Sequence, residues 1–320
     1  MITIAICCYN STSRIVRTLQ SIAGLARPQR QVEVLVVDNC STDGTSDVVR
    51  STWNKLYSPF DLCLVPAAPV GLSVARMKAI EKSAGELVVF CDDDNLLDPD
   101  YLVEAEKIMD SDPRIGCLGG QSYPVFPPGV MEAPRWFYTY ASSYAVGVQA
   151  IESGDVSGRG YLWGSGMVVR LDVLRTMIGL GLEFVTTGRK GTDLSSGEDS
   201  ELCLWMMHAG YRLWYSEKLI FGHIVPASRL AVNYVKKLHK GFNEAGQLLS
   251  AYSLSPRFRS LAAKGKPWPI KPLFLAYYWL YYHLKSEETV RRNCFLIERS
   301  LPLFSPRCVV PPACTAGKGV

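Results

Sequence analysis

Residues 83–102 read SAGELVVFCDDDNLLDPDYL, and this stretch decides the fold. Its centre, Leu87–Cys91, is an apolar run that predicts a buried strand, and three aspartates follow the strand directly. Pro99 predicts the start of a helix that extends to about Asp110, because proline is favoured in the first helical turn. A buried strand, a polar turn and a helix in this order are the repeating unit of a parallel α/β sheet.

The same unit occurs three times before this stretch. Strands are predicted at residues 2–7, 32–37 and 61–65, and helices at 13–25, 45–55 and 72–83. This alternation predicts a Rossmann-like, mostly parallel sheet flanked by helices on both faces. Such sheets bind ligands beyond the carboxyl ends of their strands. The polar residues at those ends are Tyr9, Asn10, Asp38, Asn39, Asp92, Asp93 and Asp94.

The chain after residue 120 has weaker periodicity. Residues 121–160 are rich in Pro, Tyr and Ser and predict long loops. Regular structure is predicted again at 161–170, in a helix at 198–210, in a strand at 211–216 and in a helix at 229–250. The sequence has no internal repeat and no low-complexity tract, so a repeat architecture is not predicted.

The composition is that of a globular protein with a substantial core. Of 320 residues, 48% are hydrophobic and 20% are charged, which excludes disordered and fibrous proteins and allows one large domain or a domain with an appendage. None of the ten cysteines is spaced C-x-x-C, so a zinc knuckle and a thioredoxin-like site are not supported. We interpret all ten as small core residues of a reduced, cytoplasmic protein.

The charges are distributed unevenly along the chain. Residues 1–228 hold 19 Lys and Arg against 26 Asp and Glu, a net charge of −7, whereas residues 229–320 hold 15 against 4, a net charge of +11. The acidic region argues against nucleic-acid binding. The basic region contains the run PLFLAYYWLYY at 272–282, which is too short to span a bilayer, since spanning takes about 20 apolar residues. Contact with an anionic membrane surface, packing on the acidic region and packing on a second copy of the chain stay open.

Asp92, Asp93 and Asp94 are the most informative residues. Adjacent carboxylates repel one another unless a cation is present, and Mg²⁺ or Mn²⁺ binds one or two protein carboxylates together with water and substrate phosphates. The sequence therefore predicts a metal–diphosphate site at the end of this strand. The alternative is a solvated acidic turn before the following helix.

Three further residues near the same edge of the sheet suit a nucleotide. Asp38 can accept a hydrogen bond from a base or a ribose, Tyr9 can stack on a base, and Arg76 can neutralise a diphosphate. Each has a structural alternative: a turn residue, an aromatic packed at the sheet edge and a surface arginine. No G-x-G-x-x-G follows the first strand, so a dinucleotide site of the dehydrogenase type is disfavoured.

The second half of the chain supplies candidates for the chemistry. Glu198 and Asp199 begin a predicted helix, where acidic residues are favoured in any case, and Asp199 is the candidate base for an acceptor hydroxyl. His223 is a candidate ligand of a metal or a phosphate, although a lone histidine is more often structural. Gly166, in the segment GSG at 164–166, would let the backbone approach a ligand closely or would form a tight bend.

Together these motifs resemble the family 2 glycosyltransferases of the GT-A fold. The resemblance runs from residue 2 to about residue 223 and rests on the order of AICCYN, VLVVDNCSTDGT, GLSVARMKAI, ELVVFCDDDN, WGSGMVVR and GEDSELCLWMMHAGYRL. It implies a catalytic domain at 1–228, with a nucleotide-binding half at 1–120 and an acceptor half at 121–228, followed by a basic, aromatic, helical region at 229–320. It also implies inverting sugar transfer from a nucleotide-sugar, with a UDP-sugar favoured, to a hydroxyl of a glycan or lipid-linked acceptor in cell-surface polysaccharide biosynthesis.

The resemblance implies roles for single residues. Asp199, beside Glu198, would be the general base, and Asp92, Asp94 and His223 would bind Mn²⁺ or Mg²⁺. The residues that would bind the nucleotide-sugar are Tyr9, Asn10, Asp38, Arg76, Asp92, Asp93 and Gly166. Two positions depart from the family pattern: Met77 stands where Asn often follows the arginine, and Trp205 stands where a basic residue is common. We expect these departures to alter packing near the nucleotide and the acceptor or diphosphate environment.

Two other classes of function are weighed against this one. A D-x-D phosphotransferase or phosphatase would need Thr or Val after its nucleophilic aspartate, and Asn95 follows Asp94. A non-catalytic nucleotide-sugar-binding regulator would keep Asp38 and Arg76 but would not need Asp199. No Q-x-x-R-W signature is present, which favours transfer of one or a few sugars over long-chain polymerisation. The acceptor, the linkage and homo-oligomerisation are left open.

Overall fold

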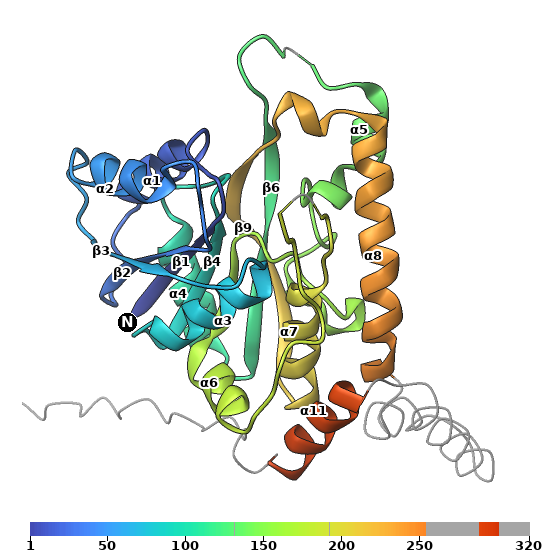
Figure 1. Ribbon diagram of the computed structural model, residues 1–320. Coiled ribbons are helices and arrows are strands. Elements are labelled where there is room, and N and C mark those ends of the chain that lie inside the picture. Colours follow the sequence, from blue (N-terminus) through green and yellow to red (C-terminus); the bar gives the residue numbers. More distant parts are fainter. Residues whose placement is uncertain (131, 192, 254–287, 301–320) are drawn as a thin grey trace, which may run out of the picture.

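The computed structural model describes residues 1–130, 132–191, 193–253 and 288–300. Nine strands in these ranges form a single sheet (Figure 1). Their bounds are β1 Ile2–Cys8, β2 Val32–Asp38, β3 Asp61–Pro66, β4 Leu87–Asp92, β5 Asn95–Leu97, β6 Ile115–Val125, β7 Gly154–Asp155, β8 Met167–Arg170 and β9 Arg212–Ile224. The order is β3-β2-β1-β4-β8-β6-β9-β5, and β7 pairs with β9 outside this order.

The half of the sheet formed by β3, β2, β1 and β4 is parallel throughout. Cys8 at the end of β1 lies opposite Asp38 of β2, and Cys7 lies opposite Asp92 of β4. In the other half β8 is antiparallel to β4 and β6, whereas β6 and β9 are parallel. The predicted α/β sheet is confirmed, and the carboxyl ends of β1, β2 and β4 meet at one edge.

Helices cover both faces of the sheet, as predicted. One apolar cluster joins Ile4 of β1 to α1, α2 and α4, and a second joins Ala5 of β1 to α3, α6 and α7. Successive residues of β1 thus face opposite helix layers, and both are buried, which explains why its sequence is continuously apolar. The bounds of these helices are α1 Ile15–Ala23, α2 Thr45–Trp53, α3 Leu72–Lys82, α4 Tyr101–Ser111, α6 Leu171–Gly179 and α7 Glu198–His208.

Two C-terminal helices, α8 (Val232–Ser253) and α11 (Glu288–Arg299), pack beside α7 (Figure 1). Tyr252 of α8 joins the three helices, because its hydroxyl accepts hydrogen bonds from Trp205 and Asn293 and donates one to Glu201. The described helices α8 and α11 therefore pack on the acidic region. The basic and aromatic segment at 257–285, for which the sequence left three arrangements open, lies outside the described residues.

The structure differs from the sequence prediction where strands pair over long distances. β6 extends to Val125, into residues predicted as loop, and β9 extends to Ile224, although the prediction ended at residue 216. The two strands pair with each other along most of their length, and this tertiary pairing is not visible in local periodicity. Within the remaining loop, residues 135–139 form the short helix α5, and regular structure in 161–170 is confined to β8.

Two cysteines contradict the interpretation that all ten are core residues. Cys40 and Cys63 are exposed, because Cys40 lies in the turn after β2 and Cys63 lies on β3, the edge strand, with one open face. Cys308 and Cys314 lie outside the described residues, as does the aromatic run at 272–282. Among the helices that the structure describes, none is long and apolar enough to cross a bilayer.

Candidate active site

The strand ends open into one cavity of about 910 Å³. Both halves of the sheet contribute to its lining, since Asp92 ends β4 and His223 lies on β9. Of the eleven site residues predicted from the sequence, nine line this cavity: Tyr9, Asn10, Arg76, Asp92, Asp93, Asp94, Glu198, Asp199 and His223. The rule that ligands bind beyond strand ends therefore locates the cavity correctly.

The other two predicted residues, Asp38 and Gly166, are not among the residues that line the cavity. The Asp38 carboxylate accepts hydrogen bonds from the Ser41 amide, at 2.9 Å, and from the Ser46 hydroxyl, so it stabilises the turn between β2 and α2. Its neighbour Asn39 does line the cavity. Direct contact between Asp38 and a nucleotide stays a prediction.

Gly166→Ala should lower the free energy of unfolding by about 1–3 kcal/mol. Gly166 has a φ of +71°, and a Cβ at this position would lie 2.6 Å from the hydroxyl oxygen of Tyr101. Tyr101 is buried and donates a hydrogen bond to the Gly166 carbonyl, so it cannot move away freely. Urea-induced unfolding measures the loss. Gly158→Ala is the control, since nothing lies within 4 Å of its added Cβ, and equal losses in both variants would contradict this role of Gly166.

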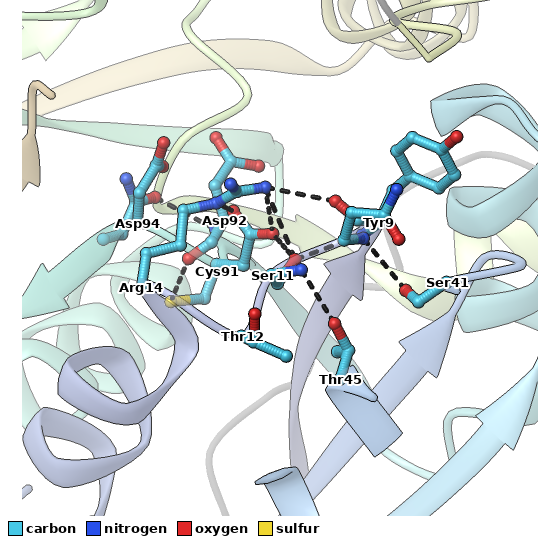
Figure 2. Close-up of polar contacts among 12 residues, drawn as sticks. Tyr9, Ser11, Thr12, Arg14, Ser41, Thr45, Cys91, Asp92 and Asp94 are labelled. Atoms are coloured by element: carbon cyan, nitrogen blue, oxygen red, sulfur yellow. Dashed lines mark hydrogen bonds and ion pairs between the residues drawn. The ribbon is translucent and has the colours of Figure 1, made fainter. Parts of the chain in front are cut away.

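Asp93 is held by Arg14 at the start of α1. Nε of Arg14 donates to Oδ1 at 2.7 Å and Nη2 donates to Oδ2 at 2.9 Å, and the Ser11 hydroxyl donates to the same carboxylate. Arg14 also donates to the Tyr9 carbonyl at 3.2 Å, and Figure 2 shows the Tyr9 ring directed away from the aspartates. Burial raises the pKa of Asp93, and Arg14 opposes this effect. Asp93 therefore ties the loop after β1 to the end of β4.

Arg76 lines the cavity between two carboxylates. Its side chain is 3% exposed, with Nη1 3.3 Å from Oε1 of Glu198 and Nη2 4.0 Å from Oδ1 of Asp92. Its guanidinium carbon lies 5.2 Å from the centre of the Phe90 ring. Burial raises the pKa of Glu198 to about 7, although Arg76 acts in the opposite direction. One guanidinium thus links the end of β4 to the acidic start of α7.

Asp94 is buried between two cationic or potentially cationic side chains. Oδ2 lies 3.0 Å from Nη1 of Arg229, and Oδ1 lies 3.5 Å from Nε2 of His223. Burial acts to raise the pKa of Asp94, but His223 and Arg229 outweigh it, so the pKa is well below its usual range. The three aspartates therefore differ in their partners: Arg76 near Asp92, Arg14 on Asp93 and Arg229 on Asp94.

Asp199 presents its carboxylate at the wall of the cavity. The Gly164 amide donates to Oδ2 at 2.9 Å, and the Ser200 amide donates to Oδ1 at 2.7 Å. Gly164 itself is required here, because a Cβ on it would lie 2.3 Å from Nη2 of Arg76. Within the described residues Asp199 has no ion-pair partner. Its carboxylate is therefore oriented by two backbone amides and not by an ion pair.

The cavity also contains residues that were not predicted from the sequence. Arg14 and Arg229 lie in CCYNSTSR and FGHIVPASR, next to predicted site residues, so their positions in the sequence were a usable signal. Arg159 stacks on Tyr161, with the guanidinium carbon 4.3 Å from the ring centre, and local periodicity does not reveal such a contact. One wall comes from α8, through Tyr234, Phe242, Ala245, Gly246 and Leu249.

The residues around Asp92 suit a hard divalent ion. The Asp92 side chain is 30% exposed, and Ser165 donates a hydrogen bond to its Oδ2. Nδ1 of His223 is buried without a hydrogen-bond partner. No three His, Cys, Asp or Glu side chains of the described residues are grouped as a ready-made metal site. Mg²⁺ and Mn²⁺ need only one or two carboxylates when substrate phosphates complete the coordination, so the donor set fits either ion.

Trp205 does not reach the cavity. It is fully buried and stacks on Phe184, with ring centres 4.6 Å apart, and its Nε1 donates to the Tyr252 hydroxyl at 2.8 Å. The expectation that Trp205 alters the acceptor or diphosphate environment is therefore wrong, because the side chain packs in the core. Met77 is partly buried against the same core.

Comparison with known proteins agrees with this geometry. A model described as Glycosyl transferase family 2 matches residues 3–150, and one described as Glycosyl transferase family group 2 matches residues 87–285, which is more than half of the chain. The chain belongs to the family 2 glycosyltransferases.

This glycosyltransferase is similar to curated proteins from bacteria. It is 25% identical over 247 residues to the succinoglycan biosynthesis protein ExoM of Rhizobium meliloti, a match that covers 74% of this chain and 71% of ExoM. It is 33% identical over 102 residues to the poly(ribitol-phosphate) β-N-acetylglucosaminyltransferase TarS of Staphylococcus aureus. The match to TarS covers 32% of this chain and 18% of TarS, so it spans less than a fifth of that relative.

Solved structures share the fold of this glycosyltransferase. The structure of TarS in complex with UDP-GlcNAc matches with a TM-score of 0.52 and 17% identity, over 95% of this chain and 86% of that one. The mannosyltransferase PcManGT of Pyrobaculum calidifontis, in complex with GDP-Man and Mn²⁺, matches with a TM-score of 0.50 and 20% identity, over 94% of this chain and 86% of that one. The fold is the GT-A fold that the family resemblance implied.

Proposed function

We propose that this glycosyltransferase transfers a sugar from a nucleotide-sugar to a hydroxyl of a glycan or lipid-linked acceptor, with inversion, in cell-surface polysaccharide biosynthesis. The observation that carries the proposal is the position of Asp199, which two backbone amides orient at the wall of the cavity that also contains Asp92. ExoM is named for succinoglycan biosynthesis and TarS for a poly(ribitol-phosphate) acceptor, which supports a polymer of this kind.

The chemistry assigned to Asp199 is proton transfer. Its carboxylate would accept the proton of the acceptor hydroxyl as the hydroxyl oxygen bonds to the anomeric carbon and the bond to the nucleoside diphosphate breaks. Attack and departure on opposite sides of that carbon invert its configuration. The Gly164 and Ser200 amides would hold the carboxylate in one orientation before the reaction begins. The entropy cost of orienting the base would then not add to the reaction barrier.

Asp92 and Asp94, together with His223, would hold Mg²⁺ or Mn²⁺. When bound, the ion supplies positive charge that stabilises the departing diphosphate. Arg76 and Arg14 would hold Asp92 and Asp93 in place, and Tyr9 and Asn10 would contact the nucleoside. The TarS and PcManGT structures contain different nucleotides, UDP-GlcNAc and GDP-Man, so the preference for a UDP-sugar rests on the family resemblance.

A calorimetric titration tests the donor site. The full chain is titrated with UDP, GDP, dTDP and their sugars, with and without Mn²⁺. We expect one nucleotide to bind in a manganese-dependent manner, and Asp92→Asn to lose that dependence, because the variant replaces a hard carboxylate ligand by an amide.

The control is Asp100→Asn, which removes an exposed carboxylate just before α4 that does not line the cavity. Binding of no nucleotide by the demonstrably folded chain would contradict the proposed function. Nucleotide binding that Mn²⁺ does not affect would contradict the proposed metal site but not the proposed transfer of a sugar.

The helix α8 is proposed to complete the acceptor side of the cavity, since it forms one of the cavity walls. Membrane contact through the region 229–320 and homo-oligomerisation stay predictions. Flotation with liposomes of anionic lipid, with and without residues 268–320, measures the first, and light scattering measures the second.

A further inference from the structure

The ion pair between Arg229 and Asp94 differs from the other pairs in the cavity. Arg14 donates two hydrogen bonds to Asp93, at 2.7 and 2.9 Å, which is the bidentate geometry of a firmly held carboxylate. Arg229 approaches Asp94 through one nitrogen at 3.0 Å. Within the described residues its guanidinium has no partner other than Asp94. Arg229 therefore supplies charge to Asp94 but leaves most of its donors unused.

The side chain of Arg229 borders the cavity. Its side chain is 16% exposed and lines the cavity together with Asp92 and Asp94. The backbone is fixed, because the Arg229 amide donates to Pro226 at 2.9 Å and its carbonyl accepts from the Tyr144 hydroxyl at 2.9 Å. Tyr144 in turn stacks on Tyr234 of α8. A long side chain on an anchored backbone can change partner without moving the helix behind it.

Two ligands of the proposed function would compete for this pair. A divalent ion needs the Asp94 carboxylate that Arg229 now contacts. A diphosphate can accept two hydrogen bonds from the Arg229 guanidinium, whereas Asp94 now offers it one carboxylate oxygen. Without ligands, a buried Asp94 needs a cation, since an unpaired buried carboxylate is costly. Arg229 meets this need in the ligand-free chain.

We propose that Arg229 is the place-holding cation of Asp94, and that it moves from Asp94 to the diphosphate of the donor when the divalent ion and the nucleotide bind. This inference rests on the proposed function, whose donor site it extends by one residue. Binding of the ion to Asp94 would release Arg229 from Asp94, and Arg229 could then bind the diphosphate. Metal binding and donor binding would therefore favour each other. The two binding events are then coupled through a single side chain.

Arg229→Gln tests the place-holding role by binding alone. Mn²⁺ is titrated into the full chain without nucleotide, and free Mn²⁺ is measured by electron paramagnetic resonance. We expect affinity for Mn²⁺ to rise roughly tenfold or more in the variant, because a competing charge is removed from Asp94. Arg50→Gln is the matched control, since Arg50 is exposed on α2 and does not line the cavity. Unchanged or weaker Mn²⁺ binding by Arg229→Gln would overturn the proposal.

The second measurement concerns the diphosphate. With Mn²⁺ present, Arg229→Gln should weaken binding of the preferred nucleoside diphosphate by roughly tenfold to a hundredfold, the usual value of a charge-assisted hydrogen bond to phosphate, and should affect the monophosphate much less. An equal loss for both nucleotides would overturn the assignment to the diphosphate.

Arg229→Lys keeps the result decisive if the glutamine variant folds poorly. It retains the charge, so Mn²⁺ binding without nucleotide should stay near that of the unmodified chain, whereas the bidentate contact to diphosphate is lost. Stronger Mn²⁺ binding in this variant would show that charge is not the cause. If the unmodified chain binds no nucleotide, the proposed function fails, and the Mn²⁺ titrations without nucleotide still decide the exchange at Asp94.

Discussion

Asp199→Asn should lower the rate of sugar transfer by about 10²–10⁴-fold, the usual contribution of a general base, and should leave donor binding nearly unchanged. The amide has almost the shape of the carboxylate, and its single oxygen can still accept one of the two hydrogen bonds that the Gly164 and Ser200 amides donate, but it cannot take a proton. Transfer is measured by release of the nucleoside diphosphate in the presence of the acceptor, and donor binding by calorimetry.

Asp47→Asn is the control for this prediction, because Asp47 is 90% exposed on α2 and does not line the cavity. A rate in Asp199→Asn equal to that of the control would contradict the role of Asp199 as base. Transfer no faster than the uncatalysed background in the unmodified chain as well, with nucleotide binding intact, would favour a non-catalytic nucleotide-binding regulator.

Arg76→Met should lower the free energy of unfolding by about 3–5 kcal/mol, the usual cost of removing one partner from a buried ion pair. Methionine matches much of the length of arginine, so the main change is the loss of charge beside Glu198 and Asp92. Glu198 is buried at the start of α7 and would be left without its ion-pair partner. Urea-induced unfolding measures the loss, with exposed Arg50→Met as the control.

The loss in Arg76→Met should depend on pH in a defined direction. In the unmodified chain burial raises the pKa of Glu198 from 4.5 to about 7, and removal of Arg76 would raise it further. A carboxyl with a raised pKa stabilises the fold below its unfolded pKa and loses this contribution as the pH rises through the folded pKa. The variant should therefore lose less stability at pH 5 than at pH 8, and adding Glu198→Gln should recover part of the loss at pH 8. A loss independent of pH would show that packing, not charge, is responsible.

Most of the first 120 residues could be predicted from the sequence because their structure is local. The apolar runs of β1, β2 and β4 are buried on both faces, and each is followed by polar residues at the same edge of the sheet. This pattern was sufficient to place Tyr9, Arg76 and Asp92 in one cavity.

The features that could not be predicted depend on contacts between distant parts of the chain. β9 continues to Ile224 because β6 lies beside it, and nothing in residues 217–224 alone indicates that partner. The partners of the three aspartates follow the same rule: Arg14, Arg76 and Arg229 come from three separate segments. A charged residue can be recognised in the sequence, but its ion-pair partner depends on which distant segments the fold brings beside it.

The wall that α8 contributes has a practical consequence for protein engineering. The change of charge near residue 228 is an obvious place to shorten the chain for expression, since the sequence predicts a catalytic domain that ends there. A protein cut at that point would lose Phe242 and Leu249 from the cavity, and Arg229 with them. It would also lose Tyr252, the hydroxyl on which Glu201 and Trp205 converge. Any minimal version of this enzyme should therefore keep α8 and be judged by ligand binding as well as by solubility.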